Sequence, residues 1–238
     1  MSIAADAILA ELHKVEAERA RRRATTGLES KVQAIKRYQQ KRFAHTYADL
    51  LASPRYAAAS HFFLEELYGP GDFSRRDAQF ARVVPTLDRI FPQELVDTVA
   101  TLASLHALSE SLDSNMGEHL MQLEVTGPAY VRAWQATARA DDRERQIALT
   151  LEVASSLDRL TRKPLIRNSL RLMRGAARAT GLGDLQRFLE SGFETFRAMR
   201  GAKEFMSIVD ERERSLCRTL FAAKWGPHDA QARNEVLP

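Results

Sequence analysis

The stretch PQELVDTVATLASLHALSESLDSNM, residues 92–116, decides the fold class of this chain. Its apolar side chains recur at helical spacing around most of the circumference, and no glycine or proline follows its first residue. A helix that is apolar on most sides is stable only when other elements surround it. The stretch therefore predicts a central helix that begins near Pro92 and has neighbours on most of its faces.

Helical spacing extends along the rest of the 238 residues, whereas long apolar–polar alternation and Asn-Gly or Asp-Gly hairpin turns are absent. We predict an all-α fold: a compact, single-domain multi-helix bundle with a basic N-terminal helical arm. Pro85 and Pro92 are each expected to begin a helix. Further helices are predicted near residues 129–139, 142–160, 164–180, 184–200 and 202–224.

Composition divides the chain into three segments. Residues 1–52 are predicted to form a basic helical hairpin packed on the bundle, residues 53–224 the bundle itself, and residues 225–238 a flexible tail. Cys217 is the single cysteine, so an internal disulfide and a thiolate zinc site are both excluded. No stretch approaches the roughly 18 consecutive apolar residues that a membrane span needs. We therefore expect a cytoplasmic protein without a membrane span.

The run HFFLEELYGPGDFSRRD, residues 61–77, ends one helix and begins another. The first helix is predicted to span residues 54–68 and to end at Gly69-Pro70-Gly71, because glycine adopts left-handed backbone and proline cannot continue the helix. Ser74 and Asp77 resemble a capping box that restarts the chain as a helix. We expect the helix of residues 54–68 to pack directly against the central helix. Its predicted core residues are Phe62, Phe63, Leu67 and Tyr68.

Two predicted helices carry the same polar pattern. His61, Glu65 and Tyr68 are spaced i, i+4, i+7, and a second set with this spacing lies on the central helix. One interpretation is a buried network of satisfied hydrogen bonds. The alternative is an iron or other divalent metal site, with haem as its weaker form, although the Glu-x-x-His pairs of di-iron bundles are absent. The metal-ligand candidates are His61, Glu65, His106, Glu110 and Asp113.

Charge is segregated along the chain. Residues 1–42 hold ten Lys or Arg against five Asp or Glu, whereas residues 90–131 hold six acids and no Lys or Arg. Residues 159–183 hold seven bases and no acid. Within this last segment four arginines share one face of a predicted helix, so they form a candidate site for an anion or an acidic partner. These are Arg167, Arg171, Arg174 and Arg178.

Two other readings of the arginine face remain open. The face could simply be solvated, or it could dock on the acidic residues 90–131 of the same chain. Nucleic acid is not expected as the partner, because no aromatic residues alternate with the arginines and no nucleic-acid-binding motif is present.

The run FFLEELYGPGDFSRRDAQFARVVP, followed by FPQELVDTVATLASLHALSESLD, resembles an uncharacterised family of bacterial proteins named for its FFLEELY motif. The resemblance is specific over residues 53–116. It implies a bacterial, cytoplasmic, helical protein, and it supplies no catalytic or binding residues.

Motifs typical of enzymes are absent: the sequence has no glycine-rich phosphate loop, no G-x-S-x-G elbow and no H-E-x-x-H. We therefore expect a non-enzymatic protein without a cofactor that acts by association with another protein or with itself. The alternative is a metal- or tetrapyrrole-binding helical-bundle enzyme that uses the His61/Glu65 and His106/Glu110 pairs.

Overall fold

The structure is a computed structural model that describes residues 2–67, 70–225 and 234–238. All regular elements of these residues are helical, which confirms the all-α, single-domain bundle. The elements are α1 (Ile3–Ala24), α2 (Leu28–Thr46), α3 (Ala48–Ala52), α4 (Ala57–Phe62), the π-helix η1 (Phe63–Leu67), α5 (Ser74–Ile90), α6 (Gln93–His119), α7 (Gly127–Ala136), α8 (Ala140–Leu160), α9 (Pro164–Ala179), α10 (Gly183–Ala198) and α11 (Lys203–Ala222).

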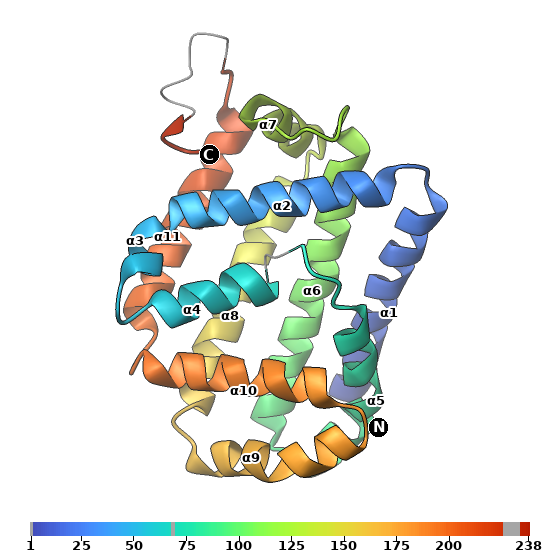
Figure 1. Ribbon diagram of the computed structural model, residues 1–238, viewed down its shortest axis with the longest axis vertical. Coiled ribbons are helices and arrows are strands. Elements are labelled where there is room, and N and C mark those ends of the chain that lie inside the picture. Colours follow the sequence, from blue (N-terminus) through green and yellow to red (C-terminus); the bar gives the residue numbers. More distant parts are fainter. Residues whose placement is uncertain (1, 68–69, 226–233) are drawn as a thin grey trace.

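The helices form two layers that cross each other (Figure 1). One layer contains α1, α6, α8 and α11 side by side, with α5 against α1. The other layer lies in front of it in Figure 1 and contains α2, α4 and α10, with α4 packed on α10. The short helix α7 covers α6 and α11 at one end, and α9 packs on α10 at the other. The two N-terminal helices, α1 and α2, thus lie in different layers.

The prediction of a central helix is confirmed by α6. It begins directly after Pro92, it contacts helices of both layers, and its side chains Val96, Leu112 and Met116 are buried. Helix α2 crosses α6 near the C-terminal end of α6. The two helices are so close there that a Cβ at Gly117 of α6 would lie 2.7 Å from Cγ2 of Val32 on α2. Glycine is therefore required at this crossing.

The helix that carries the FFLEELY motif does not pack where it was expected. Its main neighbours are α3 and α10, and the ring of Phe62 lies against Gly192 of α10. Phe62 and Phe63 are buried, as predicted for the motif. The side chain of Leu67 and the whole of Tyr68 lie outside the described part of the chain. Its aromatic side chains pack on α10 and α11, whereas the polar side chains of α6 need charged partners and find them on α1, α2 and α5.

Of the helix starts predicted at Ser74, Pro85 and Pro92, the first and the last are confirmed. A helix begins at Ser74, where the side chain of Asp72 accepts a hydrogen bond from the Ser74 amide at 2.9 Å, and another begins after Pro92. The prediction for Pro85 is wrong, because this residue lies inside α5. Proline removes one backbone hydrogen bond and crowds the preceding turn, and at this exposed position the surrounding packing of α5 outweighs that cost.

The C-terminal residues return to the bundle. Leu237 is buried in the cluster formed by α2, α7 and α11, and Tyr38 Oη donates to the carbonyl oxygen of Pro238 at 3.4 Å. The greater part of the predicted tail, residues 226–233, lies outside the described residues. None of the described helices combines the length and the apolar character that crossing a membrane requires.

We predict that Phe63→Ala lowers the free energy of unfolding by about 3–5 kcal/mol, because the ring packs against Phe196 and Phe205 and its removal leaves a void. Denaturant unfolding followed by circular dichroism measures the loss. The control is Leu165→Ala, an exposed site at which we expect a change within about 0.5 kcal/mol. A loss below about 1 kcal/mol for Phe63→Ala would show that the motif is not a core element.

Candidate functional site

The most heavily charged part of the interior surrounds Glu110 on α6. This side chain is buried, and its two carboxylate oxygens bind cations from two different helices. Oε1 accepts from Nζ of Lys36 on α2 at 2.6 Å, and Oε2 lies 2.5 Å from Nη1 of Arg22 on α1. Arg22 also donates to the backbone carbonyl of Glu110 at 2.6 Å. Glu110 therefore ties both helices of the N-terminal hairpin to the centre of the bundle.

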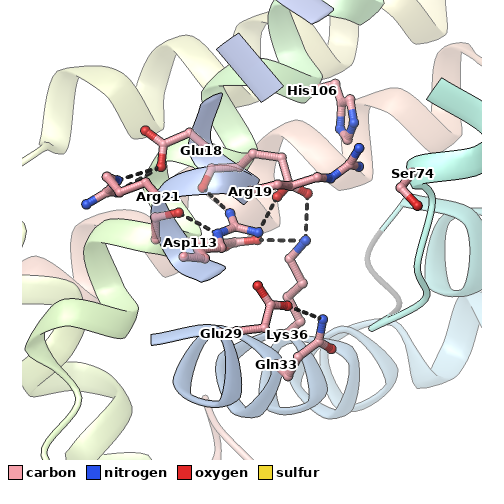
Figure 2. Close-up of polar contacts among 12 residues, drawn as sticks. Glu18, Arg19, Arg21, Glu29, Gln33, Lys36, Ser74, His106 and Asp113 are labelled. Carbon is pink, nitrogen blue, oxygen red and sulfur yellow. Dashed lines mark hydrogen bonds and ion pairs between the residues drawn. The ribbon is translucent and has the colours of Figure 1, made fainter. Parts of the chain in front are cut away.

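Asp113, one turn further along α6, extends this arrangement. Its Oδ1 accepts from Nε2 of Gln39 at 2.9 Å, and its Oδ2 lies 3.9 Å from Nζ of Lys36. Figure 2 shows Lys36 reaching from α2 toward Asp113, with Arg19 close to His106. Nε of Arg22 donates to Oγ of Ser114 at 2.6 Å, so the guanidinium has partners on several sides. We call Arg19, Arg22, Lys36, Gln39, Asp77, His106, Glu110 and Asp113 the buried charge network.

The third polar residue of the α6 pattern, His106, binds a carboxylate from α5. Its Nε2 lies 2.8 Å from Oδ2 of Asp77, and an ionised carboxylate can only accept, so the imidazole donates. Arg19 Nη2 donates to the same oxygen at 2.6 Å. The expected capping box of Ser74 and Asp77 is therefore wrong, since Asp77 turns inward to these two donors and Asp72 caps the helix instead.

The network holds its carboxylates in the ionised form. Burial raises the pKa of Glu110, but the charges of Lys36, Arg22 and His106 outweigh it and bring the pKa from 4.5 down to about 2. Burial likewise raises the pKa of Asp77, but the hydrogen bonds and charges of His106 and Arg19 have the larger effect, so the pKa is lowered overall. A carboxylate with so low a pKa is a weak base at neutral pH. The geometry therefore suits charge neutralisation better than proton transfer.

A cavity of about 150 Å³ lies between the two helix layers. Lys36, Asp77 and Glu110 line it from the network, and aromatic rings and aliphatic side chains form more than half of its wall. Arg76 also lines it, with its guanidinium 4.2 Å from the ring centroid of Phe73 and 4.3 Å from that of Phe188. The cavity thus combines apolar walls with the paired polar side chains of the network.

The structure does not bring the two predicted metal-ligand pairs together. His61 and Glu65 lie on the surface, with side chains 56% and 69% exposed, and form a local pair at 3.8 Å. His106 and Glu110 are bound by Asp77, Arg22 and Lys36, as described above. Within the described parts of the chain, no group of three or more His, Cys, Asp or Glu side chains is placed to hold a metal ion.

The four predicted partner-binding arginines all lie on α9 but differ in their contacts. Arg167 and Arg174 pair with acids of α10: Arg167 with Glu194 at 3.4 Å and Arg174 with Glu190 at 2.6 Å. Arg171 and Arg178 are exposed and have no ion-pair partner in the described part of the chain. The face does not dock on residues 90–131 as a whole, although Lys163, just before α9, pairs with Glu94.

The basic members of the network were missed by the sequence analysis. Arg19, Arg22 and Lys36 belong to the segment with excess positive charge, and Glu110 and Asp113 belong to the segment that has acids and no bases. Complementary charge in two segments was the signal that could have found them. The exposed pair of Arg21 and Glu118 also joins the basic segment to the acidic one.

A family model described as "Domain of unknown function (DUF8198)" matches residues 18–227. The chain belongs to this family. The match covers the buried charge network from Arg19 onward, the cavity and α9, so these features lie within the DUF8198 domain. The comparisons found no similar curated protein and no similar solved structure. An uncharacterised family is thus confirmed, whereas the FFLEELY name and a bacterial source stay predictions.

We predict that Glu110→Gln lowers the free energy of unfolding at pH 7 by about 3–5 kcal/mol, because it leaves Arg22 and Lys36 as buried cations without a carboxylate. The matched control is Glu65→Gln, the same change at a side chain that is 69% exposed. There we expect less than about 0.5 kcal/mol. Equal losses in the two variants, measured by denaturant unfolding, would contradict a stabilising role for the network.

The low pKa of Glu110 also predicts acid sensitivity. Because the pKa is about 2 in the folded chain and 4.5 ordinarily, this contribution to stability is complete above about pH 4.5 and is lost as the pH falls toward 2. It amounts to about 3 kcal/mol. The free energy of unfolding, measured from pH 7 to pH 2.5, should therefore decrease less steeply for Glu110→Gln than for the wild type. Parallel pH profiles would refute this assignment.

Proposed function

We propose that this chain is a non-enzymatic helical protein that acts by binding another protein through the exposed face of α9. The observation that carries the proposal is the exposure of Leu165, Leu172 and Met173, at 71%, 84% and 38%. They make up half of the exposed large apolar side chains in the described part of the chain. Single exposed apolar residues need no explanation, but several on one helix face are typical of an interaction surface.

The helix geometry explains why this face lacks a partner within the chain. Ile166 and Ala177 are the buried residues of α9, and they face α10. At about 100° per residue, Leu165 and Leu172 lie about 100–120° round the helix from Ile166, and Met173 lies between them and the buried residues. The apolar part of α9 is therefore wider than the contact with α10 requires.

The charges beside this face favour an acidic partner. Arg171 and Leu172 lie about 100° apart on the side of α9 that faces away from Ile166, so a guanidinium and an apolar side chain are exposed on the same half of the helix. Arg171 and Arg178 keep their charges available, because the acids of α10 are occupied by Arg167 and Arg174. An amphipathic helix with Asp or Glu along the edge of its apolar face would satisfy both features.

Self-association is less well supported by the same residues. In a two-fold symmetric contact through α9, Arg171 and Arg178 would approach their own copies, and like charges oppose such a contact. Among the described residues, no observation favours the metal- or tetrapyrrole-binding alternative. A protein partner is therefore our proposal, with a cytoplasmic location as an accompanying expectation.

We predict that Arg171→Glu combined with Arg178→Glu abolishes partner binding and leaves the fold intact, because both side chains are exposed. The probe is a synthetic helical peptide with Leu on one face and Glu along its border, and its comparator has Lys in place of Glu. The wild type should bind the acidic peptide at least about 10-fold more tightly than the double variant does. Fluorescence anisotropy measures both affinities, and circular dichroism checks the fold.

The control is Arg132→Glu combined with Arg145→Glu, which changes the net charge equally at two exposed arginines on α7 and α8. It should bind the acidic peptide as the wild type does. Equal binding by the α9 variant, or equal binding of the two peptides, would overturn the proposal. If the wild type binds anionic phospholipid vesicles and the α9 variant alone does not, the partner is a membrane instead of a protein. If the wild type dimerises in sedimentation and the α9 variant alone does not, the partner is a second copy of the chain.

A further inference from the structure

Two side chains of α7 that line the cavity carry polar groups without a hydrogen-bond partner among the described residues. Tyr130 is fully buried, Trp134 is 6% exposed, and both line the cavity. Neither the Tyr130 hydroxyl nor the Trp134 Nε1–H has a hydrogen-bond partner among the described residues. Buried polar groups are almost always paired, because water satisfies them in the unfolded chain and burial alone does not. Two such groups in one place therefore point to a molecule that pairs with them.

The local sequence explains why the two groups lie together. Thr126 caps α7, since its side chain accepts from the Ala129 amide at 3.4 Å, and the helix starts at Gly127. Tyr130 and Trp134 are then four residues apart and share one helix face, with their ring centroids 5.9 Å apart. Both side chains thus belong to the part of the cavity wall that α7 contributes.

The chemistry of these atoms specifies what they bind. The indole Nε1–H can only donate, so the group that pairs with Trp134 must accept. Burial raises the pKa of Tyr130, so its hydroxyl keeps a proton to donate. The guanidinium of Arg143 lies 4.0 Å from the ring centroid of Trp134, and Arg42 and Arg143 also line the cavity. The α7 wall therefore favours an oxygen acceptor.

The remaining walls specify the body of the ligand. Phe63, Phe80 and Phe188 line the cavity together with aliphatic residues such as Val99 and Ile147. An engineered apolar cavity of about 150 Å³ in another protein holds one benzene molecule, which is the volume of this cavity as well. The space is thus suited to a single ring or an aliphatic group of similar size.

We infer that the cavity binds a small, largely apolar molecule, about the size of one aromatic ring, through an oxygen acceptor placed between Tyr130 and Trp134. This site goes beyond the proposed partner binding by α9 and uses none of its residues. The network residues that line the cavity are paired with one another, so they do not supply the partner that Tyr130 and Trp134 lack.

The test uses three probes with equal numbers of non-hydrogen atoms: benzoate, acetophenone and isopropylbenzene. Titration calorimetry on the full chain should show one-to-one binding of benzoate or acetophenone that is at least about 10-fold tighter than binding of isopropylbenzene, which lacks an acceptor. Preference for benzoate would identify an acid and preference for acetophenone a neutral carbonyl compound. Tyr130→Phe, which removes only the hydroxyl, should reduce this difference about 10-fold.

The control is Tyr56→Phe, a buried tyrosine outside the cavity whose hydroxyl donates to Glu204 at 2.5 Å. It should leave the affinities unchanged. A second readout does not depend on a cavity variant: in Trp225→Phe only Trp134 fluoresces, since the chain has two tryptophans, and the bound probe should change its emission. No saturable binding, equal binding of isopropylbenzene, unchanged binding by Tyr130→Phe or unchanged Trp134 emission at saturation would each overturn the inference.

Discussion

The neutralisation of Glu110 is the constraint on which the rest of the structure depends. A carboxylate in the middle of a central, largely apolar helix loses its hydration on folding, which costs several kcal/mol unless cations and hydrogen bonds replace the water. Here Arg22 and Lys36 replace it, one from each helix of the N-terminal hairpin. Both helices must therefore dock on α6 for either charge to be satisfied. Residues 1–46 are for this reason part of the interior and not an appended arm.

The same constraint explains why the interior contains a cavity. Polar side chains of α6 pair with donors on α1 and α2 and with the Asp77 carboxylate on α5, and the apolar segment of α4 and η1 packs on α10. Phe63 completes a cluster with Phe196 and Phe205 on that side. Lys36 joins α2 of one layer to α6 of the other, and the ring of Phe63 meets Phe205 on α11. Side chains that are already paired cannot collapse into the space between them without losing their partners.

Basic residues serve two different purposes in this chain. Arg22 and Lys36 of the first two helices are buried against Glu110 of α6, where removal of one partner leaves an unpaired charge. Arg171 and Arg178 on α9 are instead solvent-exposed beside apolar side chains. The excess of positive charge in the two sequence segments does not distinguish the two groups, whereas the burial of the individual side chains does. This difference is why we assign stability to the first group and partner binding to the second.

The sequence by itself determined the helical class, the central position of α6, most helix boundaries and the arginine face of α9, because these follow from periodicity and from glycine and proline within a few residues. It also indicated that His106, Glu110 and Asp113 form a polar pattern facing inward. Only the tertiary structure decided which side chains meet that pattern, since Arg22, Lys36 and Asp77 reach it from helices remote along the chain. It placed His61 and Glu65 on the surface although their spacing is the same. Spacing within a helix specifies which residues share a face, whereas the neighbours of that face depend on how the whole chain pairs its buried charges and fills its core.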